Sequence, residues 1–267
     1  MTGLREPRAD KPGAPRLIRR SPFWWAVSKG LVLAFTKVWF RMRVEGRANV
    51  PATGPVLLVA NHASYIDPPL VGITAGRWVA FLAQAGLGKL GPLRWWLGQM
   101  GVTLIDRSAP SKDALRVIAE SLSRGEAVGI FPEGTRSADG TVGPFRNGVE
   151  FLVRRTGACV VPIGLDGNHR AFPRKAWLPR PSKVVVRYGA PMSADEVLAP
   201  GGVEQLRAKV AELARAPLRT PAPGEPPAPE GAVSGSPHRS DSTASTAPAA
   251  GGVGPVSSSP PSAGGGA

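Results

Sequence analysis

From residue 42 onward, short apolar runs alternate with longer segments in which apolar residues recur every three or four positions. This alternation limits the possible folds more than any other feature of the chain. Short runs bounded by Gly, Pro, Asn or Asp predict strands, and amphipathic segments predict helices. The expected strands are 42–46, 55–60, 78–83, 102–106, 126–131, 159–165 and 183–188. The expected helices are 67–75, 92–99, 111–124, 146–156 and 193–215. Such alternation predicts an α/β domain with a largely parallel (mixed) central sheet flanked by helices.

A histidine and an aspartate stand at the end of one of these strands. His62 follows the apolar run 56–60, and Asp67 comes five residues later, directly before two prolines that disfavour a continuing strand. In α/β folds, chemistry is placed where strands end. A carboxylate that accepts the imidazole Nδ1–H fixes the tautomer and leaves Nε2 to take a proton from a hydroxyl. The pair therefore predicts a general base, although this spacing also suits a histidine that only ties down a loop.

A second polar group follows the apolar run 127–130. The segment Phe131-Pro132-Glu133-Gly134-Thr135-Arg136-Ser137 places a carboxylate, a small hydroxyl and a guanidinium at another strand end. Two such groups in one predicted sheet make a shared site at one edge more plausible than two unrelated loops.

These segments resemble the motifs of the glycerolipid acyltransferases, the family typified by 1-acylglycerol-3-phosphate acyltransferase. The first motif is the His62-to-Asp67 block, and the third is 131–137 without change. The second is similar to 101–107, which ends in Asp-Arg, and the fourth to 160–164, an apolar strand with an internal proline. The resemblance covers roughly residues 35–215 and four motifs in the right order.

The resemblance implies transfer of a fatty acyl group from acyl-CoA or acyl-carrier protein to the free hydroxyl of 1-acylglycerol 3-phosphate. His62 and Asp67 are the expected catalytic residues. Ser64 is the nearby hydroxyl that could act as a nucleophile, but its position suits a turn residue. No Gly-x-Ser-x-Gly segment is present. We therefore expect direct transfer between the two substrates, with no cofactor beyond the acyl donor.

The expected substrate-binding residues carry charge or allow close approach. Arg136 suits the acceptor's phosphate, because a guanidinium matches phosphate oxygens two at a time. Glu133 is expected to bind an acceptor hydroxyl or to orient Arg136, with a structural ion pair as the alternative. Gly134 lets the backbone approach a ligand, and Thr135 can add a hydrogen bond. Arg107 can supply a second phosphate contact or pair locally with Asp106.

One segment departs from the family's pattern. After the predicted strand 78–83, many members have a lysine and, two residues later, a glutamate, where this chain has Gln84 and Gly86. That lysine is thought to help bind the substrate phosphate. Lys89 or Arg94 could replace it, so the identity of the acceptor stays open.

The charge of the chain favours an anionic partner. The formal net charge is +14, and the excess lies within the first 216 residues. Because no common nucleic-acid motif accompanies it, the expected partners are a phospholipid membrane surface and phosphorylated substrates rather than nucleic acid. Cys159 is the single cysteine, and the three histidines are scattered, which argues against a zinc site.

The ends of the chain differ from its centre. Residues 1–20 are predicted to be a disordered basic arm, 21–41 an amphipathic helix, 42–216 the acyltransferase domain, and 217–267 a disordered tail rich in Pro, Ala, Gly and Ser. The aromatic face of the helix suits a membrane interface, and packing of that face on the domain is the alternative. The expected location is the cytoplasmic face of the cell membrane, as a peripheral or monotopic protein.

Three other functions stay open at this point. The same chemistry could act on another acceptor, such as glycerol 3-phosphate, a lysophospholipid or a glycolipid. His62 could instead activate water in a hydrolase. A non-catalytic membrane-binding module could also keep this fold.

Overall fold

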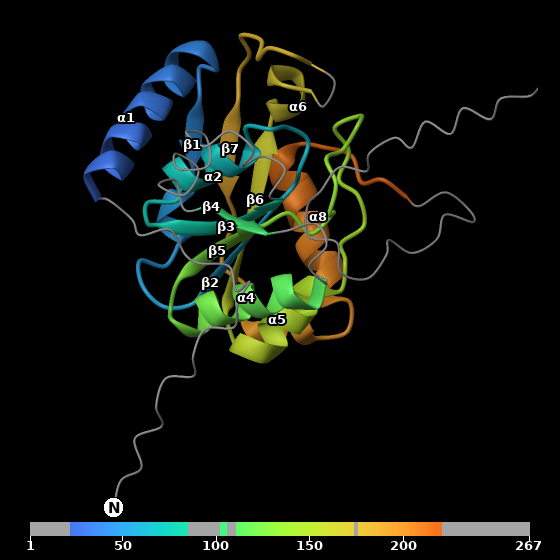
Figure 1. Cartoon of the computed structure of the whole chain (residues 1–267). Helices are drawn as coiled ribbons and strands as arrows, with labels where there is room; N and C mark the ends of the chain where they lie inside the picture. Colours follow the sequence, from blue (N-terminus) through green and yellow to red (C-terminus); the bar gives the residue numbers. More distant parts are fainter. Residues whose placement is uncertain (1–21, 85–101, 106–110, 174–175, 221–267) are drawn as a thin grey trace, which may run out of the picture. The chain divides into compact units, whose positions relative to one another are not determined.

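The computed structural model describes residues 22–84, 102–105, 111–173 and 176–220 (Figure 1). Within them a seven-stranded sheet has the order β1-β7-β6-β2-β5-β3-β4. The strands are β1 (Arg43–Glu45), β2 (Val56–Ala60), β3 (Val79–Gln84), β4 (Val102–Ile105), β5 (Ala127–Ile130), β6 (Cys159–Asp166) and β7 (Val185–Tyr188). Every pair of neighbours is parallel except β6 and β7. The predicted mixed, largely parallel sheet is confirmed, and each predicted strand is present.

Helices cover both faces of this sheet. They are α1 (Pro22–Trp39), α2 (Asp67–Thr74), α4 (Ser111–Ser123), α5 (Gly148–Thr156), α6 (Asn168–Ala171), α7 (Ala194–Leu198) and α8 (Gly202–Ala214), with a 3₁₀ turn, η1, at Arg47–Asn49. The short α6 and η1 were not predicted. The predicted helix 92–99 lies outside the described residues.

Side chains alternate along β2 between two apolar cores. Val56, Leu58 and Ala60 pack with α1 and α2 on one face. Leu57 and Val59 pack with α4, α5, α7 and α8 on the other face. All five residues are buried, which explains why this strand reads as one continuous apolar run.

The predicted helix 193–215 is two helices, so that prediction was wrong in one respect. Ala199 between α7 and α8 is extended, and Gly201 adopts a φ of 76°. Pro200 disfavours helical backbone in the residue before it, and glycine accepts the left-handed conformation without strain. The Pro-Gly pair therefore divides the helix in two, although the apolar residues keep helical spacing through both parts.

Close contact between α8 and the sheet depends on a glycine. A Cβ added to Gly164 on β6 would collide with the α8 backbone at Leu213 and Ala214. Residues 217–220 continue from this helix and were predicted to belong to the tail. Leu218 instead forms a β-bridge with Val142, so the domain extends past residue 216.

Helix α1 turns its aromatic side outward. Ser28 and Thr36 are buried, and Val32 and Leu33 pack on the core of the domain. The exposed large side chains are Phe23, Trp24, Leu31, Phe35, Val38 and Trp39. The alternative in which the aromatic face packs on the domain is therefore wrong. Among the described helices, none combines the length and the apolarity that crossing a bilayer needs.

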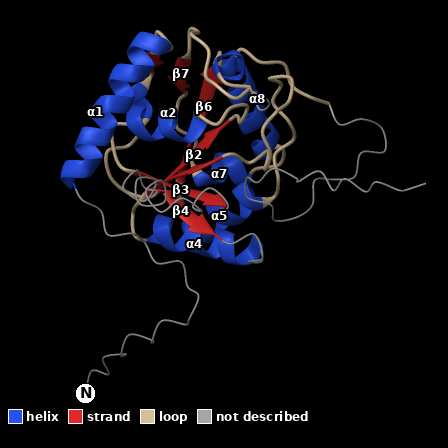
Figure 2. Ribbon diagram, turned by 45° about the horizontal axis from the view of Figure 1, so that its top comes forward, coloured by secondary structure: helices blue, strands red, loops and turns tan. Residues whose placement is uncertain are grey.

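The parallel strands bring distant segments to one edge. Because β2 lies between β5 and β6 and runs parallel to both, the segments that follow these three strands start side by side. These segments begin at residues 61, 131 and 167. Figure 2 shows β2 next to β6 in the sheet.

Candidate active site

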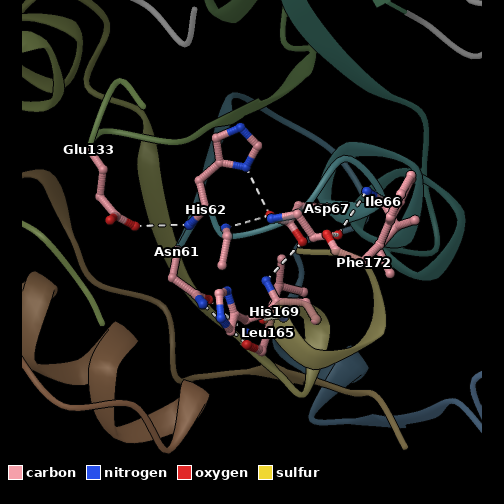
Figure 3. A network of polar contacts seen from close by, with 11 residues as sticks. Asn61, His62, Ile66, Asp67, Glu133, Leu165, His169 and Phe172 are labelled. Carbon is pink, nitrogen blue, oxygen red and sulfur yellow. Dashed lines mark hydrogen bonds and ion pairs between the residues drawn. The ribbon is translucent and has the colours of Figure 1, made fainter. Parts of the chain in front are cut away.

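His62 and Asp67 meet as the sequence predicts. His62 lies just after β2, and Asp67 is the first residue of α2. The Nδ1 of His62 lies 2.8 Å from Oδ2 of Asp67, and both side chains are buried (Figure 3). Pro68 and Pro69 occupy the first turn of α2, where no backbone N–H is needed. The short loop thus returns the carboxylate to the imidazole.

Asp67 accepts four hydrogen bonds. Oδ2 accepts from His62 Nδ1 and from the backbone N–H groups of Ala63 and Ser64, at 2.8 and 2.7 Å for the two amides. Oδ1 accepts from Asn168 Nδ2 at 2.8 Å. A fully buried carboxylate is costly unless such donors surround it. These donors position Asp67 to accept a hydrogen bond from the His62 Nδ1–H. When the imidazole carries its proton on Nδ1, its basic lone pair lies on Nε2.

Asn168 was not identified by the sequence reasoning. It begins α6, two residues after the end of β6, and its side chain is buried. The sequence held a signal for it, because a polar Gly-Asn-His segment follows the strand that neighbours β2. The structure makes Asn168 the residue that orients Asp67 from the side opposite His62.

Asn61 extends the β2–β6 ladder by side-chain bonds. Its Nδ2 donates to the Leu165 carbonyl at 3.1 Å, and its Oδ1 accepts from the Leu165 N–H at 2.8 Å. Figure 3 shows this pair beside the His62–Asp67 pair. The amide therefore fixes the backbone directly before His62.

The His62 ring stacks on the ring of Phe131, with centroids 4.3 Å apart and 25° between planes. Phe131 in turn stacks on Phe81, at 6.3 Å. Gly129 makes room for this column, because a Cβ there would collide with the Phe81 ring. The imidazole plane is thus set by packing as well as by Asp67.

Glu133 ties together three backbone segments. Oε1 accepts from the His62 N–H at 2.9 Å, and Oε2 accepts from the Gly143 N–H at 3.0 Å. In the reverse direction, the Ser137 N–H donates to the His62 carbonyl at 2.7 Å. The predicted segment 131–137 is therefore joined to the His62 backbone through both Glu133 and Ser137.

The environment of Glu133 shifts its ionisation. Burial raises the pKa of this carboxyl to about 7, and the hydrogen bonds from Gly143 and His62 offset only part of that rise. Through its hydrogen bonds with backbone amides, Glu133 stabilises the conformation of the His62 loop. Roles in binding an acceptor hydroxyl or orienting Arg136 stay predictions.

Arg136 lies on an aromatic face. Its guanidinium carbon is 3.5 Å from the centre of the Tyr65 ring. The Tyr65 ring also contacts Phe172, at 5.5 Å between centroids. The Tyr65 ring thus supports the guanidinium at the His62 loop. A cation held on a ring face contributes about 0.5–1 kcal/mol at an exposed site.

The remaining predicted residues are placed in part. Gly134 has a φ of 73°, a conformation that favours glycine, and its N–H donates to the Phe131 carbonyl. Thr135 is half-buried beside it. Arg107 and Asp106 lie outside the described residues, as do Gly86, Lys89 and Arg94, and Gln84 ends β3.

The described part of the chain contains no group of three or more His, Cys, Asp and Glu side chains arranged to hold a metal ion. What it does assemble is an oriented imidazole, a buried acceptor carboxylate and a stacked guanidinium along one edge of the sheet. This arrangement can remove a proton from a hydroxyl and bind an anionic group near it.

Comparison with known proteins supports this description. Residues 41–166 match the family model described as acyltransferase. The chain is 33% identical over 138 residues to the chloroplastic 1-acyl-sn-glycerol-3-phosphate acyltransferase LPAT1 of Arabidopsis thaliana, which is 51% of this chain and 38% of that protein. It is also 33% identical over 170 residues to the lyso-ornithine lipid O-acyltransferase of Pseudomonas aeruginosa, which is 62% of each chain. The matches span 38%, 40% and 61% of the first three curated relatives.

A solved structure has the same fold. The crystal structure of the 1-acyl-sn-glycerophosphate acyltransferase PlsC from Thermotoga maritima superposes with a TM-score of 0.54 at 28% sequence identity. The match covers 74% of this chain and 82% of that chain.

Proposed function

Residues 41–166 of this chain form a domain of the acyltransferase family, and we propose that the protein acylates the free hydroxyl of 1-acylglycerol 3-phosphate. The acyl donor is acyl-CoA or acyl-carrier protein, and the product is phosphatidic acid for phospholipid synthesis. The observation that carries this proposal is the His62 imidazole, whose Nδ1 lies 2.8 Å from a buried Asp67 that accepts three further hydrogen bonds.

In the proposed reaction His62 Nε2 takes the proton of the acceptor hydroxyl as its oxygen attacks the thioester carbonyl. The C–O bond forms, the C–S bond breaks, and the proton returns to the leaving thiolate. Asp67 stabilises the imidazolium that exists between these steps. The reaction needs no group beyond this chain and the two substrates.

Direct transfer is favoured over an acyl-enzyme. The buried Ser64 hydroxyl donates to the Phe172 carbonyl at 2.8 Å, and its oxygen also accepts from the Ile66 N–H. These hydrogen bonds suit a turn residue that stabilises the His62 loop, and they do not suit a nucleophile.

In this proposal Arg136 binds the acceptor's phosphate. The Tyr65 ring orients the guanidinium plane at the His62 loop, and a planar guanidinium can bind two phosphate oxygens at once. Thr135 and the Gly134 backbone would approach the same group, with Arg107 as a second cationic contact.

A second acceptor has specific support. The relative named for a lyso-ornithine lipid acceptor and the 1-acyl-sn-glycerol-3-phosphate acyltransferase LPAT1 are both 33% identical to this chain over the matched residues. The chain also has Gln84 and Gly86 where many family members carry a lysine and a glutamate. A panel of lysophosphatidate, lyso-ornithine lipid, glycerol 3-phosphate and lysophosphatidylcholine would separate these acceptors by their kcat/KM.

The outward aromatic side of α1 supports membrane contact. Tryptophan beside apolar side chains suits the interface of a bilayer, and the exposed Lys37 suits anionic headgroups. We propose that the protein acts at the cytoplasmic face of the cell membrane, as a peripheral or monotopic enzyme.

The test is thiol release from long-chain acyl-CoA by purified protein, with and without lysophosphatidate. We expect release that requires the acceptor and falls by ~10²–10⁴-fold in His62→Ala, because that is the usual contribution of a general base. His238→Ala is the matched control, since it removes a histidine from outside the matched domain. Release without acceptor would identify a hydrolase. No release with any donor and acceptor would leave a lipid-binding module.

A further inference from the structure

The segment before β7 exposes two large apolar side chains. Trp177 is 88% exposed and Leu178 is 61% exposed, and no other tryptophan with a described exposure is as open to solvent. Exposed large apolar groups that lie side by side usually mark a contact surface. The proposed catalytic steps make no use of either residue.

This segment adjoins the end of α1. Trp39 Nε1 donates to the Pro179 carbonyl at 3.3 Å, and the Ser182 N–H donates to the Trp39 carbonyl at 3.4 Å. Figure 1 shows the last turn of α1 and the gold segment before β7 at the same end of the sheet. The apolar side of α1, which ends in Val38 and Trp39, therefore continues onto residues 176–183.

The same segment is connected to the active site. The Arg180 N–H donates to the Ala171 carbonyl at 2.7 Å, and the neighbouring Phe172 accepts the Ser64 hydroxyl and contacts Tyr65. Topology requires this proximity: β7 runs antiparallel to β6, so the chain enters β7 at the edge where β6 ends.

The charge of this region identifies the class of partner. The sequence contains no Asp or Glu from residue 167 to 194, and none from residue 11 to 44. Within the described part of the first stretch, Arg180 and Lys183 are exposed, and the exposed Arg170 lies 3.8 Å from Asp166 in an ion pair. Exposed Trp and Leu flanked by cations without acids match a bilayer with anionic headgroups. An acidic protein partner would match the charge, but it would leave the link to the α1 side unexplained.

We infer that residues 176–183 form a second membrane-contacting segment, in which Trp177 and Leu178 enter the interface of an anionic bilayer beside α1. Together the two elements hold the edge that bears His62 against the membrane, where an acceptor hydroxyl lies at headgroup depth. This inference rests on the proposed function in one respect, that the acceptor is a lipid of the membrane.

The test measures binding of the full chain to large unilamellar vesicles of phosphatidylcholine with and without phosphatidylglycerol. We expect Trp177→Ser with Leu178→Ser to weaken binding to the mixed vesicles by ~10-fold or more, because two apolar side chains lose their burial. Phe151→Ser is the matched control, since Phe151 is 48% exposed on α5, at the other end of the sheet. Its binding should equal that of the parent.

A second pair of variants tests the charge. Arg180→Gln with Lys183→Gln should weaken binding to the mixed vesicles by ~30-fold and leave binding to pure phosphatidylcholine unchanged, because both cations lose their attraction to the anionic surface. Thermal unfolding of every variant should match the parent, since the changed side chains are exposed.

Binding by the Trp177/Leu178 variant that equals the parent's would overturn the inference and point to a protein partner. An equal loss in Phe151→Ser would overturn it as well. Activity separates this result from the proposed function. The variant should acylate a short-chain, monodisperse acceptor at the parent's rate and a vesicle-embedded acceptor more slowly. If no form of the protein transfers an acyl group, the proposed function fails while the vesicle comparison still decides the inference.

Discussion

The loops that follow β2 and β5 each bury one carboxylate, and the two carboxylates are held differently. Asp67 accepts four hydrogen bonds, one of them from an imidazole. Glu133 accepts two, both from backbone amides. Burial raises the pKa of Glu133 to about 7. The two loops lie side by side, so the different number and kind of donors around each carboxylate comes from the local sequence rather than from their position in the fold.

This difference separates the roles of the two loops. The β2 loop surrounds its carboxylate with donors and leaves it as an acceptor for His62, which suits proton transfer. The β5 loop uses its carboxylate to position the backbone of its neighbour. Substitutions in each loop should therefore affect different measurements, the catalytic rate in one and stability in the other.

The largest effect is expected at Asp67. Asp67→Asn keeps the size of the side chain but removes the charge that stabilises the imidazolium. It also replaces one acceptor oxygen by an NH₂ group, which is a donor. We expect kcat to fall ~10³-fold or more with little change in KM, because the loss of the carboxylate partner of a catalytic histidine usually has an effect of this size. Steady-state kinetics beside circular dichroism would check this. A variant with near-parental kcat would show that His62 does not need the carboxylate.

A smaller loss is expected at Asn168. Asn168→Ala removes the donor to Asp67 Oδ1 and leaves His62 in place. We expect kcat to fall ~10- to 100-fold, because supporting residues of this kind act through the group they orient. Asn168→Asp is the sharper comparison, since it turns the donor into a second carboxylate and should raise the pH at which kcat reaches half its maximum. An unchanged pH profile in both variants would leave Asn168 a purely structural residue.

Asn168 also shows where sequence reasoning stops. His62, Asp67 and 131–137 were recognisable because the residues of each motif are close together in the chain. Asn168 is 101 residues from Asp67, and only the parallel pairing of β2 with β6 brings it there. The strand pattern predicted the sheet and its mixed character, but not the order that sets these neighbours.

The orientation of α1 was open for a related reason. The helical wheel separates aromatic from polar side chains, but it does not say which side faces the domain. The structure buries Ser28 and Thr36 with Val32 and Leu33, and the Thr36 hydroxyl bonds to the Leu33 carbonyl within the helix. The small side chains of Ser28 and Thr36 allow α1 to pack closely on the domain. The aromatic side chains therefore face outward, although large apolar side chains are usually buried.

At Glu133, stability is expected to change more than chemistry. Glu133→Gln replaces one acceptor oxygen by a donor, so the N–H of either His62 or Gly143 loses its partner. A buried unsatisfied amide costs about 1–3 kcal/mol, and we expect a lower Tm with a ~10-fold lower kcat from the displaced His62 backbone. Thermal unfolding and kinetics on the same preparations would check both. An increase in acceptor KM at unchanged Tm would instead support direct substrate binding by Glu133.

The pH dependence of stability provides a second test of the same carboxyl. Because the pKa of Glu133 is raised from 4.5 to about 7, the folded protein binds this proton more tightly than the unfolded chain does. The resulting stability is fully present below pH 4.5 and is lost as the pH rises to about 7. The Tm difference between the parent and Glu133→Gln should therefore be larger at pH 5 than at pH 8. A difference that grows with pH would reverse this sign and show that Glu133 is stabilised as a carboxylate.

The smallest effect is expected at Tyr65, where the two loops meet through the Arg136 guanidinium. Tyr65→Leu removes the ring under Arg136, and the loss of about 0.5–1 kcal/mol should raise the KM for lysophosphatidate ~2- to 5-fold at unchanged kcat. Tyr65→Phe keeps the ring face and should match the parent. The KM for an acceptor without phosphate should stay the same in both variants, because Arg136 then has no anionic group to bind. If the KM rises equally for both acceptors, the ring supports the loop as a whole, and the assignment of Arg136 to the phosphate loses its support.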